Sequence, residues 1–275
     1  MSDVWSYSGK RVVVCGCFSG MGAATARELI ELGADVIGLD IRQTEVPVKQ
    51  FISVNLADRS SIDAAVDEIP FGIDALFVCS GLPGNTKWSA GEVFTVNFIG
   101  ARHLIEGVIP KLRDGGAVAS ISSAAGIGYQ AHQGDIMDLL VGAPSFEDGQ
   151  AWSEKRAELV GDGYAISKEC LILYTMWRSN ELAARGLRIN CIAPGPTDTP
   201  MMPLFEEGYG EQFMRSFPKP LGRMSTPEEQ PYPLIFLNSP AASYVTGVNV
   251  FTDGGFVAGA MTGTIDLSVM VPPES

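Results

Sequence analysis

The chain has little positive charge and no long hydrophobic run, and each shortage excludes a class of partner. Its 275 residues include 19 Lys and Arg against 32 Asp and Glu, a net charge of −13. A phosphate backbone would be repelled by that balance, and no compact basic cluster reverses it locally, so we expect no nucleic-acid partner. No apolar run approaches the roughly 18 residues that span a bilayer, and residues 1–10 are polar, unlike a signal peptide. We therefore expect no membrane partner.

Cysteines are few and widely separated. Cys15 and Cys17 lack the usual zinc-site spacing, and neither has a cluster of His or Cys nearby. Cys79 and Cys191 each end an apolar run, which predicts buried strand residues, and Cys170 stands alone. We therefore expect reduced structural thiols, no metal site and a cytoplasmic location.

What the chain does have is apolar material in a regular alternation. Hydrophobic residues make up 46% of it and charged residues 19%, enough for a substantial core. Short β-branched runs alternate with helix-patterned segments, and continuous apolar strands between helices indicate a parallel sheet covered on both faces. We predict a single α/β domain over residues 1–275: a doubly wound, Rossmann-type parallel sheet of about seven strands, with an insertion at about 127–163. Strands are expected at 10–15, 34–39, 51–54, 73–79, 116–121, 187–192 and 247–251, and helices at 20–32, after Asp58 or Ser60, at 164–185 and at 227–237.

A glycine-rich turn connects the first expected strand to the first expected helix. Its sequence is Gly16-Cys-Phe-Ser19-Gly20-Met21-Gly22. Glycine permits a tight turn and a close backbone approach, and the helix that follows aims its N-terminus at a pyrophosphate. A lone glycine triplet can be a simple turn. Here Asp40 follows at about the distance, roughly twenty residues, of the acidic residue that holds the adenosine ribose.

Asp40 also predicts which dinucleotide is bound. A carboxylate at this position repels the 2′-phosphate of NADP, and the glycine loop has no Lys or Arg to neutralise it. Arg42 is the one ambiguity, and we interpret it as a solvated side chain. NAD is therefore the expected cofactor.

Further along the chain, Asn97, Ser122-Ser123 and Tyr164-x-x-x-Lys168 follow in that order. With the glycine loop, this series resembles the short-chain dehydrogenase/reductase family over nearly the whole chain. The resemblance implies hydride transfer between a nicotinamide and a hydroxyl or carbonyl group. It also implies that Ser123, rather than Ser122, hydrogen-bonds the substrate oxygen, and that Asn97 holds a water in the proton relay.

The spacing of Tyr164 and Lys168 suggests how the proton moves. Residues four apart on one helix share a face, and a phenol has an ordinary pKa near 10, too high for a base at neutral pH. A neighbouring ammonium favours the phenolate, as does a positive nicotinamide ring. Taken singly, Tyr164 could cap a helix and Lys168 could be a surface charge. The resemblance also implies that Lys168 holds the nicotinamide ribose.

The resemblance assigns further cofactor contacts. They lie in the glycine loop and after the second, third, fourth and sixth strands: Gly16, Ser19, Gly20, Met21, Gly22, Asp40, Ile41, Asn55, Leu56, Gly81, Pro194, Gly195, Thr197 and Thr199. The family's usual Asn-Asn-Ala-Gly after the fourth strand is replaced here by Val78-Cys-Ser-Gly81, which is a departure from the pattern.

The long interval between Ser123 and Tyr164 is similar to that of the 3α-hydroxysteroid dehydrogenase/carbonyl reductase branch, and the chain also looks like coniferyl-type alcohol dehydrogenases. This implies an apolar, ring-bearing alcohol or ketone as the substrate. Met201, Met202 and Phe205 are expected substrate contacts in a flexible apolar lid; otherwise they form an amphipathic helix packed on the body. The apolar residues of the insertion either line the pocket or pack on the domain.

Two other questions stay open at this point. Family members commonly associate through the helices after strands four and five, and the insertion adjoins the second of these, so a homodimer is expected more than a homotetramer. The alternatives to a steroid or carbonyl substrate are an aryl alcohol or a role as a non-catalytic NAD sensor. A sensor needs only the glycine loop, so the presence of Asn97, Ser123, Tyr164 and Lys168 argues for an enzyme.

Overall fold

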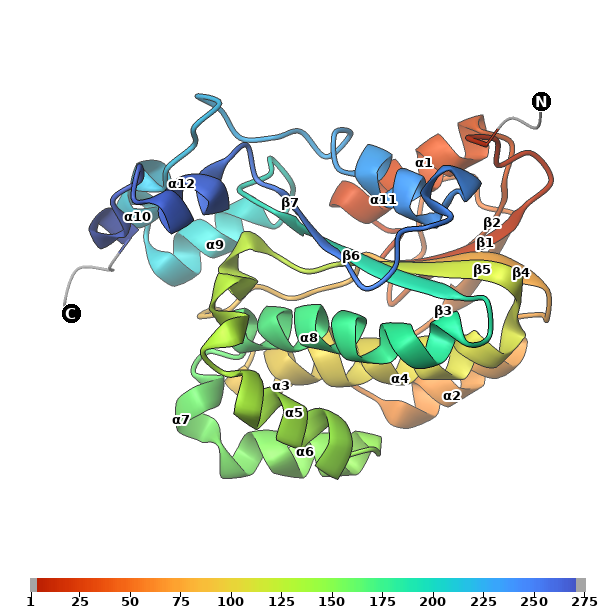
Figure 1. The fold of residues 1–275 in the computed structure, drawn as a ribbon, viewed down its shortest axis with the longest axis horizontal. Helices are drawn as coiled ribbons and strands as arrows, with labels where there is room; N and C mark the ends of the chain where they lie inside the picture. The colour runs from red at the N-terminus through yellow and green to blue at the C-terminus, as the bar shows by residue number, and fades with distance from the viewer. Residues whose placement is uncertain (1–3, 271–275) are drawn as a thin grey trace.

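A seven-stranded parallel sheet forms the centre of the computed structural model, which describes residues 4–270 (Figure 1). The strand order is β3-β2-β1-β4-β5-β6-β7 and every neighbouring pair is parallel, which confirms the predicted doubly wound sheet. The prediction of one domain over residues 1–275 extends beyond the described residues at both ends. The strands are β1 (Arg11–Cys15), β2 (Asp35–Asp40), β3 (Gln50–Ser53), β4 (Ile73–Val78), β5 (Leu112–Ile121), β6 (Arg188–Pro194) and β7 (Asn249–Thr252).

Helices follow most strands. Their bounds are α1 (Gly20–Glu31), α2 (Arg59–Glu68), α3 (Ala90–Phe94), η1 (Thr95–Gly100), α4 (Ala101–Val108), η2 (Ile109–Lys111), η3 (Ala124–Gln130), α5 (Gln133–Gly142), α6 (Phe146–Lys155), α7 (Ala157–Val160), α8 (Tyr164–Ala183), α9 (Met202–Tyr209), α10 (Glu211–Ser216), α11 (Pro231–Asn238), η4 (Pro240–Ala242), α12 (Phe256–Thr262) and η5 (Leu267–Met270). Among residues 4–270, none of these helices combines the length and the apolar character that a bilayer-spanning segment needs.

Alternating side chains of the strands divide the core into two layers. In β1, Val12 and Val14 belong to the layer under α1 and α11, whereas Val13 and Cys15 belong to the layer against α2, α4 and α8. Because successive strand residues point to opposite faces, a wholly apolar strand needs cover on both sides, and Figure 1 shows helices on both. The faces of the sheet are therefore filled, and the ends of its strands remain for a site.

The sequence predicts the starts of α2 and α11 from local capping signals, and the structure confirms one of the two. Asp58 caps α2, because its carboxylate accepts hydrogen bonds from the amides of Ser60 and Ser61. The prediction of a helix from residue 227 is wrong, since α11 begins at Pro231. Glu229 holds the preceding residues in a turn, where its carboxylate accepts the amide of Thr226 and pairs with Arg223.

The insertion forms α5, α6 and α7, which lie together below α3, α4 and α8 in Figure 1. Trp152 stacks on Phe94 with ring centroids 5.9 Å apart, and both side chains are buried. Arg102 of α4 donates hydrogen bonds to the carbonyls of Ala143 and Pro144, each at 3.0 Å. Of the two alternatives left by the sequence, these contacts support packing on the domain over lining of a pocket.

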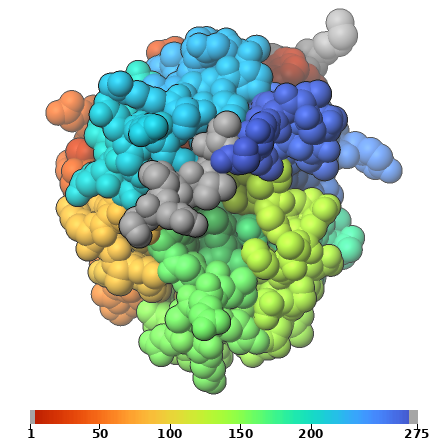
Figure 2. Space-filling view, turned by 90° about the vertical axis from the view of Figure 1, so that its left-hand side faces the viewer, coloured from red at the N-terminus to blue at the C-terminus, as the bar shows by residue number. Residues whose placement is uncertain are grey.

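All strands run in one direction, so their carboxyl ends share one edge of the sheet. Figure 2 looks onto this side of the molecule: the segment after β6 (cyan) and the end of the described chain (dark blue) form its upper half, and the insertion (green) its lower part. In open parallel sheets, ligands bind beyond the carboxyl ends, where the strand order reverses. Here the order reverses between β1 and β4, so the loops after these strands are the first place to look.

Candidate active site

The glycine loop after β1 is held too closely for side chains. Gly16 has φ +89° and a Cβ there would lie 2.7 Å from the amide nitrogen of Ser80, while a Cβ on Gly22 would lie 2.0 Å from the carbonyl oxygen of Gly16. The hydroxyl of Ser19 makes no capping hydrogen bond to α1, so it leaves the amides of the first helical turn to an anion. This uncapped helix start, with glycines at 16 and 22 where no side chain has room, fits the pyrophosphate of a dinucleotide. Met21 is the second residue of α1.

Asp40 lies at the end of β2, beside the glycine loop. One carboxylate oxygen accepts the amide of Phe18 at 3.0 Å and the other accepts the amide of Arg42 at 3.1 Å. Arg42 is exposed, as the sequence predicted, and its guanidinium stacks over the Phe18 ring, 3.9 Å from its centroid. A cation thus lies next to the predicted ribose site, held against the glycine loop. Ile41 between them is exposed.

Gly81, Asn97 and Lys168 come from three different elements and meet after β4. A Cβ on Gly81 would lie 3.3 Å from Asn97 Oδ1 and 3.4 Å from Lys168 Nζ. Asn97 is buried in the π-helix η1, where its amide group accepts from the backbone nitrogen of Leu82 at 2.6 Å and donates to the carbonyl of Leu82 at 2.9 Å. Such local π-helical turns are frequent at functional sites. The Asn97 side chain therefore fixes the loop beside Lys168, and its predicted role on a water stays a prediction.

Tyr164 is the first residue of α8, and Lys168 lies one turn further along it. The ammonium of Lys168 lies 5.7 Å from the centroid of the Tyr164 ring and donates to the carbonyl of Ile121 at 3.2 Å. Ser123 hydrogen-bonds the side chain of Tyr164, whereas the hydroxyl of Ser122 donates to the main-chain carbonyl of Lys168 at 2.8 Å. The geometry thus gives the two serines different partners, one on the phenol and one on the helix backbone.

Burial is the main cause of the pKa shifts of Tyr164 and Lys168. It raises the pKa of Tyr164 to about 12, against a lowering by the hydrogen bond from Ser123, and the carboxylate of Asp162 raises it further. Burial also lowers the pKa of Lys168 to about 8. The sequence led us to expect a phenol made acidic by Lys168. In the structure, loss of hydration outweighs that effect, because it disfavours the charged forms of both groups.

The segment after β6 approaches the glycine loop from the other side of the crevice. The side chain of Thr199 lies 3.5 Å from the position of a Cβ on Gly20. Thr197 is buried, and its hydroxyl donates to the carbonyl of Gly195 at 3.1 Å and lies 2.8 Å from the hydroxyl of Ser225. Pro194 ends β6 and leads into this turn. The backbone of the turn is therefore fixed from a segment nearly thirty residues further along the chain.

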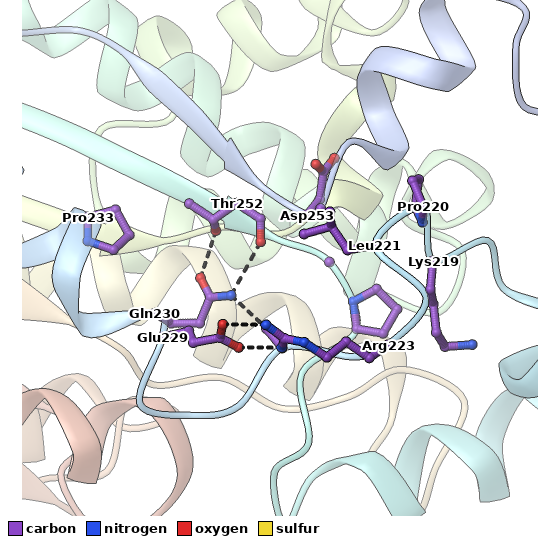
Figure 3. Close-up of a pocket in the computed structure, with 13 residues that line it drawn as sticks. Lys219, Pro220, Leu221, Arg223, Glu229, Gln230, Pro233, Thr252 and Asp253 are labelled. Carbon is purple, nitrogen blue, oxygen red and sulfur yellow. Dashed lines mark hydrogen bonds and ion pairs between the residues drawn. The ribbon is translucent and has the colours of Figure 1, made fainter.

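Gln230 anchors that support, and the sequence analysis did not identify it. The residue is 2% exposed, and its side chain accepts from the hydroxyl of Thr252 at 2.7 Å (Figure 3). It also donates to the hydroxyl of Ser225 at 2.9 Å. The hydrogen bonds run from Gln230 through Ser225 to Thr197, beside a cavity of about 180 Å³ behind Gly195. No local motif marks Gln230, because its partner Thr252 and the turn that it supports through Ser225 lie in distant parts of the sequence.

The segment that was expected to form an apolar lid is α9 with α10. Phe205 places its ring edge-on against the Tyr164 ring, with centroids 5.1 Å apart. Met202 is buried and Met201 is partly buried at the start of α9. Among the residues predicted for the lid, Phe205 is therefore in direct contact with the Tyr164 ring. Asp162 and Tyr209, which also meet here, were not identified from the sequence.

Two predicted adenine contacts lie at the end of β3. The side-chain oxygen of Asn55 accepts the amide of Ala57 at 3.0 Å, so this group already has a local partner. Leu56 is buried, and its carbonyl oxygen would lie 2.0 Å from a Cβ on Gly100. Contact of Asn55 and Leu56 with a cofactor stays a prediction.

Comparisons with known proteins agree with this geometry. A family model described as short chain dehydrogenase matches residues 10–134, and one described as enoyl-(acyl carrier protein) reductase matches residues 152–257. The chain is 34% identical over 251 residues to the 3-alpha-hydroxysteroid dehydrogenase/carbonyl reductase of Comamonas testosteroni, covering 90% of this chain and 96% of the relative. It is 30% identical over 250 residues to the coniferyl-alcohol dehydrogenase of a Pseudomonas species, covering 90% and 97%.

A solved structure gives the same result. The crystal structure of the 3-alpha-hydroxysteroid dehydrogenase from Pseudomonas sp. B-0831, complexed with NADH, superposes with a TM-score of 0.79 at 28% identity, covering 94% of this chain and all of that one (100%). The sheet order, the glycine loop and the two full-length relatives at 30% identity or more lead to one conclusion. The chain belongs to the short-chain dehydrogenase/reductase family.

Proposed function

We propose that this oxidoreductase transfers hydride between NAD and a secondary alcohol or ketone on an apolar ring substrate, such as a 3α-hydroxysteroid, a 3-ketosteroid or a xenobiotic carbonyl compound. The observation that carries the proposal is the hydrogen bond between Ser123 and Tyr164, next to Lys168. Two hydroxyls that meet can both reach one substrate oxygen. A donor aimed at an oxygen where charge develops is the usual electrostatic contribution to carbonyl chemistry.

Tyr164, Ser123 and Lys168 have different roles in the proposed reaction. Bound NAD would supply the hydride acceptor in oxidation, and NADH the donor in reduction. Tyr164 takes the proton of the substrate hydroxyl in oxidation and returns it in reduction. Ser123 hydrogen-bonds the same oxygen and orients it. Lys168 is held by the carbonyl of Ile121 and favours the phenolate of Tyr164 through its charge.

Several groups would hold the cofactor. The bare turn of Gly16 and Gly22 would admit the pyrophosphate to the start of α1, and Asp40 would accept hydrogen bonds from the ribose hydroxyls. The carboxylate of Asp40 faces the amide of Phe18 in the loop itself, which supports its assignment to the ribose. The turn of Gly195 and the threonines that follow it would hold the carboxamide of the nicotinamide.

The choice of NAD has a direct test. The ratio of kcat/KM for NAD to that for NADP should favour NAD, because the Asp40 carboxylate repels a 2′-phosphate. Asp40→Ser removes the repulsion between the carboxylate and the 2′-phosphate. It should reduce this ratio at least about tenfold, since a loss of about 1.4 kcal/mol of repulsion changes the ratio by a factor of ten. Arg42, stacked on Phe18, is near enough to help NADP once the carboxylate is gone. A wild-type enzyme that prefers NADP would overturn the assignment.

Substrate class is tested with a panel. NADH formation is followed by its near-ultraviolet absorbance with 3α-hydroxysteroids, secondary cyclic alcohols and aryl primary alcohols, at equal concentration. We expect the hydroxysteroids to have the highest kcat/KM. A ranking led by aryl alcohols would favour the second candidate, a coniferyl-type activity, which is supported by the 30% identity to that relative. Absence of turnover with every alcohol, together with tight NADH binding, would favour an NAD sensor.

We also propose a homodimer and a cytoplasmic location. The insertion covers part of the helical surface after β4, where Trp152 stacks on Phe94 and Arg102 binds the carbonyls of Ala143 and Pro144. A surface covered in this way is not open to a second subunit, and this favours a dimer over a tetramer. Light scattering that gives the mass of a monomer would contradict the proposed dimer.

A further inference from the structure

One carboxylate joins the start of the helix of Tyr164 to the end of the lid. Asp162 stands two residues before Tyr164, and its Oδ1 accepts the Tyr164 amide at 2.9 Å. Its Oδ2 accepts the hydroxyl of Tyr209, the last residue of α9. The two carboxylate oxygens of Asp162 therefore accept hydrogen bonds from two different helices, α8 and α9.

The lid makes a second contact with the same tyrosine. Phe205 lies one helical turn before Tyr209, and the two rings stack with centroids 6.0 Å apart and an interplanar angle of 24°. Phe205 in turn meets the ring of Tyr164 edge-on. Residues four apart share a helix face, so Phe205 and Tyr209 lie on the same face of α9. Phe205 contacts the ring of Tyr164, and Tyr209 is linked through Asp162 to the backbone amide of Tyr164.

The loop after β4 closes around the Asp162–Tyr209 pair. A Cβ on Gly84 would lie 2.3 Å from Oδ2 of Asp162 and 2.6 Å from the hydroxyl of Tyr209. A Cβ on Gly208 would lie 2.7 Å from the carbonyl oxygen of Gly84. At both glycines a side chain would push Asp162 and Tyr209 apart. The loop after β4, the start of α8 and the end of α9 therefore meet at the hydrogen bond between Asp162 and Tyr209.

We propose that Asp162 and Tyr209 form a latch that fixes the α9 lid against the helix of Tyr164, and that both are positioning residues for substrate capture and proton transfer. The inference rests on the proposed function. It extends it, because neither residue belongs to the glycine loop or to the Ser, Tyr and Lys series. The latch couples closure over the substrate to the placement of the proton-transfer group.

The charge of Asp162 gives the latch a property that packing alone would not have. The groups that face Tyr164 are Ser123, Lys168 and Asp162, with Tyr209 behind Asp162. The negative carboxylate of Asp162 raises the pKa of Tyr164. Removal of that charge lowers the pKa of the phenol, so the rise of the oxidation rate with pH moves to lower pH.

Two variants separate the hydrogen bond from the charge. Tyr209→Phe keeps the ring and removes the bond, and should raise KM for the alcohol about tenfold with the pH profile unchanged, since hydrogen bonds to charged groups are worth roughly a factor of ten or more. Asp162→Asn leaves one acceptor oxygen for two donors and removes the charge. It should raise KM to a similar extent and also move the alkaline rise of kcat/KM to lower pH.

A matched control and a readout without turnover complete the test. Tyr232→Phe removes the hydroxyl of a tyrosine that is 57% exposed on α11, and should leave both parameters at wild-type values. Amide hydrogen exchange of residues 202–209, measured without substrate, should be faster in Tyr209→Phe than in the wild type and unchanged in Tyr232→Phe. Wild-type exchange of this segment in Tyr209→Phe would overturn the latch even if the substrate panel shows no activity. Faster exchange with an inactive wild type would retain the latch and overturn only the proposed function.

Discussion

Gly22 packs directly onto Gly16: a Cβ on Gly22 would lie 2.0 Å from the carbonyl oxygen of Gly16. A backbone atom at that distance cannot rotate away as a flexible side chain can. The closeness of these two residues sets the turn between β1 and α1, and with it the direction in which the first amides of α1 point.

Gly22→Ala should therefore displace the turn and weaken NADH binding. Overpacking against backbone costs about 1–3 kcal/mol, so we expect the Kd for NADH to rise about tenfold or more. Isothermal titration calorimetry measures it. Gly134→Ala in α5 is the matched control, since nothing lies within 4 Å of a Cβ there. Unaltered NADH binding by Gly22→Ala would show that the loop does not hold the pyrophosphate.

Gln230→Leu should affect the cofactor more than the alcohol. It removes the acceptor of the Thr252 hydroxyl and one of the two partners of the Ser225 hydroxyl, which keeps Thr197, at a cost of about 1 kcal/mol, and so loosens the turn that carries Thr197. We expect KM for NAD to rise several-fold while KM for the alcohol changes little. Gln133→Leu, at an exposed position of α5, controls for the change of residue type. Equal increases in the two KM values would contradict a role specific to the cofactor side.

The two adjacent serines should respond differently to alanine. Ser123→Ala removes the partner of Tyr164 and should lower kcat about 100-fold, the usual effect of losing one donor to a developing oxyanion. Ser122→Ala removes a buried hydrogen bond to the Lys168 carbonyl, and should lower stability by about 1 kcal/mol with most of kcat retained. Steady-state kinetics and thermal unfolding of both variants measure the contrast. The opposite pattern would exchange the roles of the two residues.

The pH dependence follows from the two shifted groups. Because burial raises the pKa of Tyr164 to about 12, its phenolate is the minor form near neutral pH, and alcohol oxidation should accelerate as pH rises. Burial lowers the pKa of Lys168 to about 8, so its positive charge is lost above that pH and the rise should flatten there. Ketone reduction uses the protonated phenol and should stay near its maximum through neutral pH. Profiles of kcat/KM in both directions test this, and oxidation that slows between about pH 7 and 8 would contradict it.

Much of the fold followed from local pattern. The β1, β2 and β4 predictions agree with the structure to within one residue, because strands buried on both faces are continuous apolar runs. β5 begins at Leu112 rather than 116, since residues 113–116 are polar or glycine and give no hydrophobic signal. The start of α11 was placed too early because the turn before it depends on the pairing of Glu229 with Arg223.

The site was predictable where a motif is local, and not where partners are distant. Gly22 and the Tyr164–Lys168 spacing are marked in the sequence itself. The partners of Gln230, and the pairing of Asp162 with Tyr209 across 47 residues, are set by how the lid and the strands pack. The net pKa of Tyr164 was also beyond the sequence, because it depends on burial that only the folded chain creates.

The central claim is that the phenol of Tyr164 carries the proton, and Tyr164→Phe tests it most directly. The ring and its contact with Phe205 remain in this variant, and the hydroxyl alone is lost. NADH titration and single-turnover kinetics on the same preparation should give a Kd within about twofold of wild type and a hydride-transfer rate lower by about 10³-fold or more. Near-normal turnover in Tyr164→Phe would contradict the account.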